Sequence, residues 1–122
     1  MSATDTAAIT GYHAHVYYDA ETRPRAADLR AGFEARFAER LEANAGEIRM
    51  GRWHDNPIGP HPMGSYQIAF PPELFAQIVP WLVLNRQGLT VFIHPETGDD
   101  VTDHSDYAIW LGTQRTIDLS VL

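Results

Sequence analysis

The clearest strand in this chain is the run Gly11-Tyr-His-Ala-His-Val-Tyr-Tyr18. Successive side chains of a strand point to opposite faces of the sheet. One face of the run therefore carries Tyr12, Ala14, Val16 and Tyr18. The other face carries His13, His15 and Tyr17. The run thus predicts a half-buried strand that presents two imidazoles side by side on its second face.

Two stretches outside this run have the character of helices. Apolar residues recur every four positions over residues 24–44 and predict one amphipathic helix, with a proline in its first turn where no backbone N–H is needed. The pair Pro71-Pro72 opens a second helix that ends at Gly88. Pro80 falls inside this second helix, so we expect a kink or an early end there.

Three more segments have the character of strands: 48–53, 65–70 and 89–93. The resulting order is β-α-β-β-α-β, which is typical of the ferredoxin-like fold. We therefore predict an α+β protein whose antiparallel sheet carries two helices on one face. Residues 95–122 form a C-terminal extension of unassigned structure. Residues 1–9 are expected to be a disordered leader, and residues 10–122 a single domain.

Length and composition exclude several classes of function. A chain of 122 residues supports one hydrophobic core. The net charge is −7 and the nine cations, all arginine, are scattered, so no nucleic-acid partner is expected. No apolar run reaches the roughly 20 residues that span a bilayer, and the N-terminus lacks a secretory signal. A soluble, cytoplasmic protein without membrane contact is the expectation.

The six histidines are the main functional signal, because without cysteine a metal must be bound by His, Asp, Glu or water. Neutral imidazole is the commonest protein ligand for iron, zinc or copper. His13 and His15 should have Cα atoms about 6.5–7 Å apart, which suits two ligands of one ion.

Topology should add further histidines to this pair. The last strand of the fold runs antiparallel beside the first, so His94 should lie near His13 on the same open face. The loop between the second and third strands should bring His54 and His61 to that edge. A lone histidine in a strand is more often a structural residue. The metal-site hypothesis therefore depends on several of these histidines lying close together. The acidic segment 99–103 is either a solvated turn or a source of one carboxylate ligand.

Four ordered motifs together resemble the Dopa 4,5-dioxygenase family over about residues 10–113. They are Tyr12-His-Ala-His-Val-Tyr-Tyr18, Gly59-Pro-His-Pro62, Val91-Phe-Ile-His-Pro-Glu-Thr-Gly-Asp99, and Asp103-His104 with Trp110-Leu-Gly112. The resemblance implies an extradiol dioxygenase that opens a catechol ring with O2 at non-haem Fe(II). Its substrate would be L-DOPA or a related substituted catechol such as caffeate.

Residue roles follow as expectations from this chemistry. The simplest metal site is His13, His15 and His94, with His61 as a competitor and Glu96 as the carboxylate if the usual two-His-one-carboxylate site applies. A spare imidazole, His61 or His104, would act as the catalytic acid and base on the catechol. Position alone suggests that Tyr17, Arg52 and His54 bind the substrate.

Three alternatives remain open on the sequence. The same fold could carry out another metal-dependent reaction, or serve as a non-catalytic module that senses metal or pH, or be a structural domain with scattered histidines. Open sheets usually need a partner over an exposed face or edge. We therefore expect a homodimer, with residues 117–122 as a candidate interface strand.

Overall fold

The computed structural model describes residues 2–122, which form a five-stranded antiparallel sheet in the order β2-β3-β1-β4-β5. The strands are β1 (Gly11–Tyr18), β2 (Arg49–Met50), β3 (Gly64–Phe70), β4 (Val91–Glu96) and β5 (Ile109–Leu111). The helices are α1 (Arg23–Arg36), α2 (Phe75–Asn85) and the short α3 (Asp100–Asp103). Short 3-10 turns cover Thr6–Ala8, Ala38–Arg40, Glu42–Asn44, Pro72–Leu74 and Leu119–Val121.

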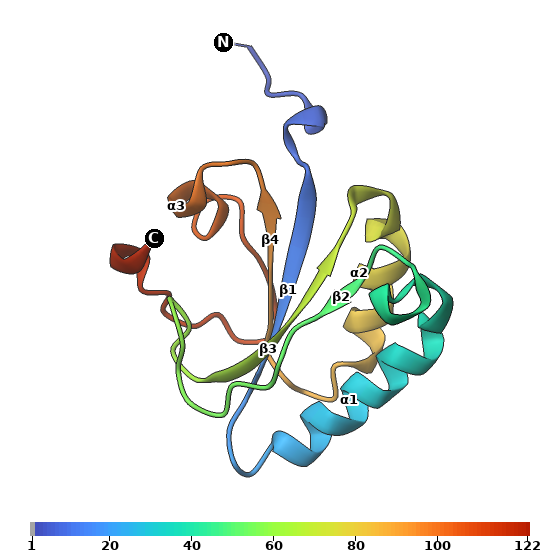
Figure 1. Ribbon diagram of the computed structural model, residues 1–122. Helices are drawn as coiled ribbons and strands as arrows, with labels where there is room; N and C mark the ends of the chain where they lie inside the picture. Colours follow the sequence, from blue (N-terminus) through green and yellow to red (C-terminus); the bar gives the residue numbers. More distant parts are fainter. Residues whose placement is uncertain (1) are drawn as a thin grey trace.

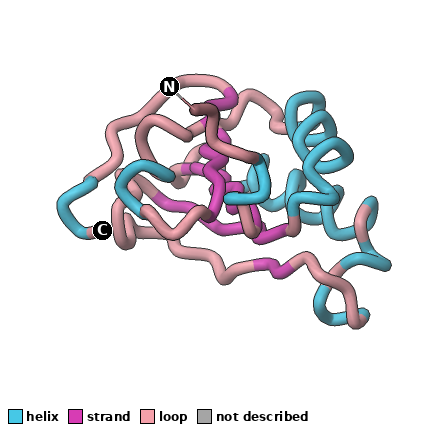
Figure 2. The backbone as a smooth tube through the Cα atoms, turned by 90° about the horizontal axis from the view of Figure 1, so that it is seen from above, coloured by secondary structure: helices cyan, strands magenta, loops and turns pink. Residues whose placement is uncertain are grey.

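The sheet separates two unlike layers. Helices α1 and α2 lie on one side of it, and α3 with the C-terminal segment lies on the other (Figures 1 and 2). The helix side holds the hydrophobic core, which includes Phe33 of α1, Ile78 of α2 and Ile68 of β3. The α+β, ferredoxin-like prediction is confirmed, with β5 as an additional strand at the edge of β4.

The register of β1 settles which side chains share a face. Ala14, Val16 and Tyr18 belong to the buried core cluster, together with Val91 and Ile93 of β4. Alternation then places the residues between them on the opposite face. There His13 pairs laterally with His94 of β4, and His15 with Phe92. The predicted division of the two strands into a core face and an open face is correct.

The first helix is shorter than predicted. It ends at Arg36, and the chain continues through two 3-10 turns instead of reaching residue 44. Phe37 is nevertheless buried against the core. The amide groups of Asn44 and Gly46 both donate to the Leu41 carbonyl, which tightens the chain at this point. The apolar spacing therefore indicated the burial of one face correctly, although the backbone there is not α-helical.

Two other element predictions need correction. The second strand covers Arg49 and Met50 and is followed by an isolated bridge from His54 to Ser65 of β3, so it is much shorter than residues 48–53. Helix α2 begins at Phe75, after a 3-10 turn, and runs on through Pro80 to Asn85. Proline removes one hydrogen bond to the carbonyl four residues earlier. That carbonyl belongs to the exposed Ala76, where water can satisfy it.

The chain ends also differ from expectation. Residues 117–122 are not a strand: they contain the 3-10 turn Leu119–Val121, and the Asp118 amide donates to the Pro60 carbonyl at 3.0 Å. Homodimer formation through this segment stays a prediction. Within the expected leader, Asp5 caps a 3-10 turn at Thr6–Ala8, and Met1 lies outside the described residues. Among the described helices, none has the length and apolar character needed to cross a membrane.

Candidate metal centre

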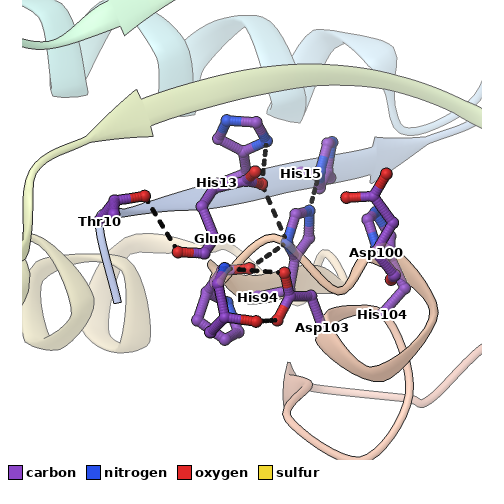
Figure 3. Close-up of polar contacts among 10 residues, drawn as sticks. Thr10, His13, His15, His94, Glu96, Asp100, Asp103 and His104 are labelled. Atoms are coloured by element: carbon purple, nitrogen blue, oxygen red, sulfur yellow. Dashed lines mark hydrogen bonds and ion pairs between the residues drawn. The ribbon is translucent and has the colours of Figure 1, made fainter. Parts of the chain in front are cut away.

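Strands β1 and β4 place three imidazoles around one point on the open face. His13 and His15 come from β1, and His94 comes from the adjacent position of β4 (Figure 3). Each of the three rings offers one nitrogen, and these three nitrogens all lie within 4.8 Å of one another. The Nε2 atoms of His15 and His94 are 3.1 Å apart. This spacing is close enough for the three side chains to ligate a single cation.

Hydrogen bonds orient two of these rings. Nδ1 of His94 lies 3.0 Å from the Pro95 carbonyl oxygen, which can only accept, so this nitrogen carries the proton. Nδ1 of His13 lies 3.1 Å from a carboxylate oxygen of Glu96 and donates to it in the same way. Both rings are thereby left with an unprotonated Nε2, the usual partner of a metal when Nδ1 is held by an oxygen.

The electrostatics favour neutral rings. Burial lowers the pKa of His94 to about 4 and puts the pKa of His15 well below its ordinary value, with smaller contributions from neighbouring imidazoles. Burial also lowers the pKa of His13. His15 is 5% exposed and His94 1% exposed. Unprotonated imidazoles have the lone pair that a metal ion requires, so the donor set fits a transition metal.

Glu96 stands at the edge of this cluster. Its carboxylate contacts Nδ1 of His13 and lies 3.5 Å from Nδ1 of His94. Burial raises its pKa, and the charges of Asp103 and Asp100 raise it further. In this arrangement Glu96 faces the outer nitrogens of the rings, which is where a carboxylate orients metal-binding histidines.

His61 joins the cluster from a different direction than predicted. Because β3 is antiparallel to β1, the loop before Gly64 lies beside Tyr18, at the far end of β1 from His13. His61 therefore approaches His15, with ring centroids 4.2 Å apart, and its Nδ1 lies 2.7 Å from the buried Tyr17 hydroxyl. Burial, followed by the charges of nearby histidines, lowers its pKa to about 4.

The remaining substrate-binding candidates line a small cavity next to His61. His54 exchanges two backbone hydrogen bonds with Ser65 and is held there. It shares a cavity of about 190 Å³ with Arg52, His15 and His61. Arg52 is exposed, and His54 is half-buried. The predicted convergence of His54 on the His13 edge is therefore wrong, since its loop reaches the other end of the strand.

His104 reaches the cluster from the turn at α3. Its ring centroid is 3.9 Å from that of His94, and its Nδ1 donates to the Asp100 carbonyl at 2.7 Å. Asp103 is 1% exposed and accepts hydrogen bonds from the amide and hydroxyl of Thr97, at 2.9 and 2.6 Å. Asp103 is thus a buried structural group, and the interpretation of this segment as a solvated acidic turn is wrong for it.

Sequence reasoning missed two parts of the site. Phe92 and Trp110 stack with centroids 4.5 Å apart and extend the open face beyond His15. Alternation along β4 placed Phe92 on this face, but nothing in the sequence placed Trp110 beside it. Arg49 was also missed; its position in the cavity beside His13 depends on the register of β2.

Comparisons with known proteins identify relatives of this chain. The model of the Dopa 4,5-dioxygenase family matches residues 12–121. A DOPA 4,5-dioxygenase from Amanita muscaria is 33% identical over 117 residues, which cover 93% of this chain and 50% of that protein. An uncharacterized 21.2 kDa protein from Botryotinia fuckeliana is 34% identical over 119 residues, covering 91% of this chain and 62% of that one. The chain therefore spans only about half to three-fifths of these curated relatives.

A crystal structure offers a further comparison at nearly full length. It is that of a Nostoc punctiforme protein provisionally assigned as a dioxygenase, which is 50% identical and superimposes with a TM-score of 0.88. The match covers 98% of this chain and 96% of that one. The match of the family model over almost the whole domain and the identity to these relatives lead to one conclusion: the chain belongs to the Dopa 4,5-dioxygenase family.

Proposed function

We propose that this protein is an extradiol dioxygenase that opens the ring of L-DOPA or a related substituted catechol with O2 at a non-haem Fe(II). The observation that carries the proposal is the cluster of His13, His15 and His94, whose donor nitrogens gather within 4.8 Å. Family membership and the name of the Amanita muscaria relative support the reaction class.

The three imidazoles would hold the iron from the sheet side and leave its other side open. His13 and His15 would bind it from β1, and His94 from the neighbouring strand β4. When bound, Fe(II) supplies the redox chemistry that allows O2 to react with a catechol. All three ligands are neutral, so the Glu96 carboxylate, which holds the outer nitrogen of His13, would place a negative charge behind the ligand set.

The aromatic side chains next to the cluster suit a catechol ring. Phe92 packs against His15, His94 and Trp110, and its ring is stacked on that of Trp110. Phe92 is fully buried, so Trp110, half-buried and backed by Phe92, is the ring of this pair that an aromatic ligand could contact, stacked or edge-on. A catechol that approached the cluster along this wall would be positioned with its two oxygens toward the imidazoles.

Acid–base chemistry is assigned to the two remaining rings. His104 lies beside His94 with its Nδ1 held by the Asp100 carbonyl, so its Nε2 would take the proton of a catechol hydroxyl and later return it. His61 lies on the other side of His15, and the buried Tyr17 hydroxyl holds its Nδ1. Tyr17 would therefore act through His61, while Arg52 and His54 would contact the substrate at the cavity they line.

Oxygen uptake tests this proposal. The protein is loaded with Fe(II) without oxygen, mixed with L-DOPA or caffeate in air, and followed by an oxygen electrode and visible absorbance. We expect one O2 consumed per catechol and a yellow ring-opened product. Binding of iron without catechol-dependent oxygen uptake would instead support a non-catalytic metal-binding module. Failure to bind any metal would contradict the site itself.

A further inference from the structure

We infer that Arg49 binds a carboxylate on the side chain of the catechol substrate, and so makes the protein selective for anionic catechols over uncharged ones. The ligand class follows from the proposed function, on which this inference rests. The position of the carboxylate follows from the sheet register, the cavity beside His13 and the balance of charges around it.

The register places Arg49 in line with the metal centre. Arg49 on β2 is directly opposite Ala69 on β3, which is opposite His13 on β1, which in turn is opposite His94 on β4. Laterally paired residues point to the same face of a sheet. Two strand spacings, roughly 10 Å, separate Arg49 from His13. The residue between them is alanine, so no large side chain stands between the guanidinium and the imidazole.

A cavity of about 360 Å³ occupies this position. Arg49, His13 and Glu96 all line it, and Ala69 forms part of its floor. The guanidinium and the metal centre therefore face a common space.

The charges in this cavity leave Arg49 available. Glu47 also lines the cavity, but it is paired with Arg40, whose Nε lies 3.0 Å from its carboxylate. Glu96 is engaged by His13. Among residues 2–122, the ion pairs give Arg49 no carboxylate partner. An exposed cation without a carboxylate partner among the described residues, beside a cavity, favours an anionic ligand.

The distance between the two sites restricts the ligand further. The catechol oxygens would lie at the imidazoles, and the carboxylate would lie about two strands away. A carboxylate joined to the ring through two or three carbons spans that interval, whereas unsubstituted catechol does not. Arg52 lies in a separate cavity on the His61 side of the cluster, and it is the competing position for the same carboxylate.

Equilibrium binding tests the inference without requiring turnover. The Fe(II)-loaded full chain is titrated by calorimetry, in the absence of oxygen, with 3,4-dihydroxyphenylpropanoate and with uncharged 4-ethylcatechol. Loss of a charged hydrogen-bonded pair should weaken binding about 10- to 100-fold. We expect Arg49→Gln to show that loss for the carboxylate ligand alone, and Arg49→Lys to restore part of it. Arg36→Gln on α1, on the other side of the sheet, is the matched control and should bind both ligands as the parent does.

Several results would overturn the inference. Equal weakening for both ligands would mean that Arg49→Gln disturbs the metal centre in general. Unchanged binding, a selective loss in Arg52→Gln instead, or failure of the parent protein to prefer the carboxylate ligand would each reject Arg49 as its site. The proposed function fails separately: selective, Arg49-dependent binding without oxygen uptake would reject dioxygenase activity and leave the carboxylate site standing.

Discussion

Neighbouring residues fix the position and the tautomer of the His94 ring. The β1–β4 register puts it opposite His13, the Pro95 carbonyl fixes its protonated nitrogen, and the His15 ring stacks beside it at 5.2 Å between centroids. Its side chain is almost fully buried, yet the nitrogen that faces His15 has no backbone partner to saturate it. A buried, unprotonated nitrogen next to two others is what a metal ion would use.

Substitution of His15 and His94 tests whether these residues bind iron. His15→Ala and His94→Ala should each lose stoichiometric iron, because each substitution removes one of the three proposed donors. Both variants should keep the circular dichroism spectrum of the folded protein, because backbone pairing holds the sheet together. Metal content after loading and desalting is the measurement. Gln67→Ala is the control, since Gln67 is opposite His15 on β3 and offers no imidazole. Full iron content in either histidine variant would remove that residue from the ligand set.

Sequence reasoning reached some site residues and not others, for a physical reason. Strand alternation has a fixed period of two, so the shared face of His13, His15 and His94 could be predicted. Arg49 and Trp110 join the site only through lateral register, which no local pattern encodes. His104 depends on the turn geometry that Asp103 and Thr97 impose.

At the scale of elements, the turn between β4 and β5 positions His104, the proposed acid–base residue. It brings His104 over His94, and its shape rests on Asp103, whose two oxygens accept from the amide and hydroxyl of Thr97. Asp99 caps the same turn by accepting from the amide and hydroxyl of Thr102. The carboxylates of Asp99 and Asp103 therefore stabilise the turn by accepting hydrogen bonds, rather than binding a metal ion.

Asp103→Ala should accordingly destabilise the protein and misplace His104. Removing a buried carboxylate leaves the two Thr97 donors without a partner, which costs roughly 1–3 kcal/mol. Urea unfolding measures the loss, and oxygen uptake with catechol should fall more than the metal content does. Asp106→Ala, at an exposed position in the same segment, is the control and should unfold as the parent does. Equal unfolding midpoints for both variants would show that Asp103 does not hold the turn.

The C-terminal segment gives a prediction about assembly. Val121 and Leu122 are exposed apolar residues, although the segment is a 3-10 turn and not the strand expected from its sequence. We expect the full chain to sediment as a homodimer and a variant lacking residues 115–122 to sediment as a monomer, because burial of such residues favours association. A dimer of the truncated variant would place the interface elsewhere, and a monomeric full chain would reject the dimer.

At the scale of the whole molecule, the fold explains why the sequence predicted the architecture better than the element ends. The core face is a continuous layer of apolar residues from β1, β3, β4 and both long helices, and that pattern is visible locally. The end of α1 at Arg36 and the shortness of β2 depend on the 3-10 turns between them. Those turns bury Phe37 as a longer helix would, so the apolar spacing could not distinguish 3-10 turns from a continued α-helix.

Stability of the metal-free protein should depend on pH through the buried histidines. The pKa of His94 is about 4 in the folded protein and about 6.5 when unfolded. Between these pH values the unfolded chain binds more protons than the folded protein does. The contribution of His94 to the free energy of unfolding is therefore fully present above about pH 6.5 and is lost as the pH falls toward 4. The loss attributable to His94 is about 3 kcal/mol at most.

Urea unfolding of chelator-treated protein across that pH range measures this dependence. His94→Gln is the matched comparison, because glutamine does not titrate and the slope should become shallower. An identical slope in the two proteins would show that His94 is not the group responsible.

The proposed insertion of O2 into a catechol ring is tested most directly by isotope labelling. The Fe(II)-loaded protein is mixed with 3,4-dihydroxyphenylpropanoate or L-DOPA under isotopically heavy O2, and the product is analysed by mass spectrometry. We predict a ring-opened product in which both atoms of one O2 molecule are found. A product that carries a single labelled oxygen, or an unlabelled quinone, would contradict it.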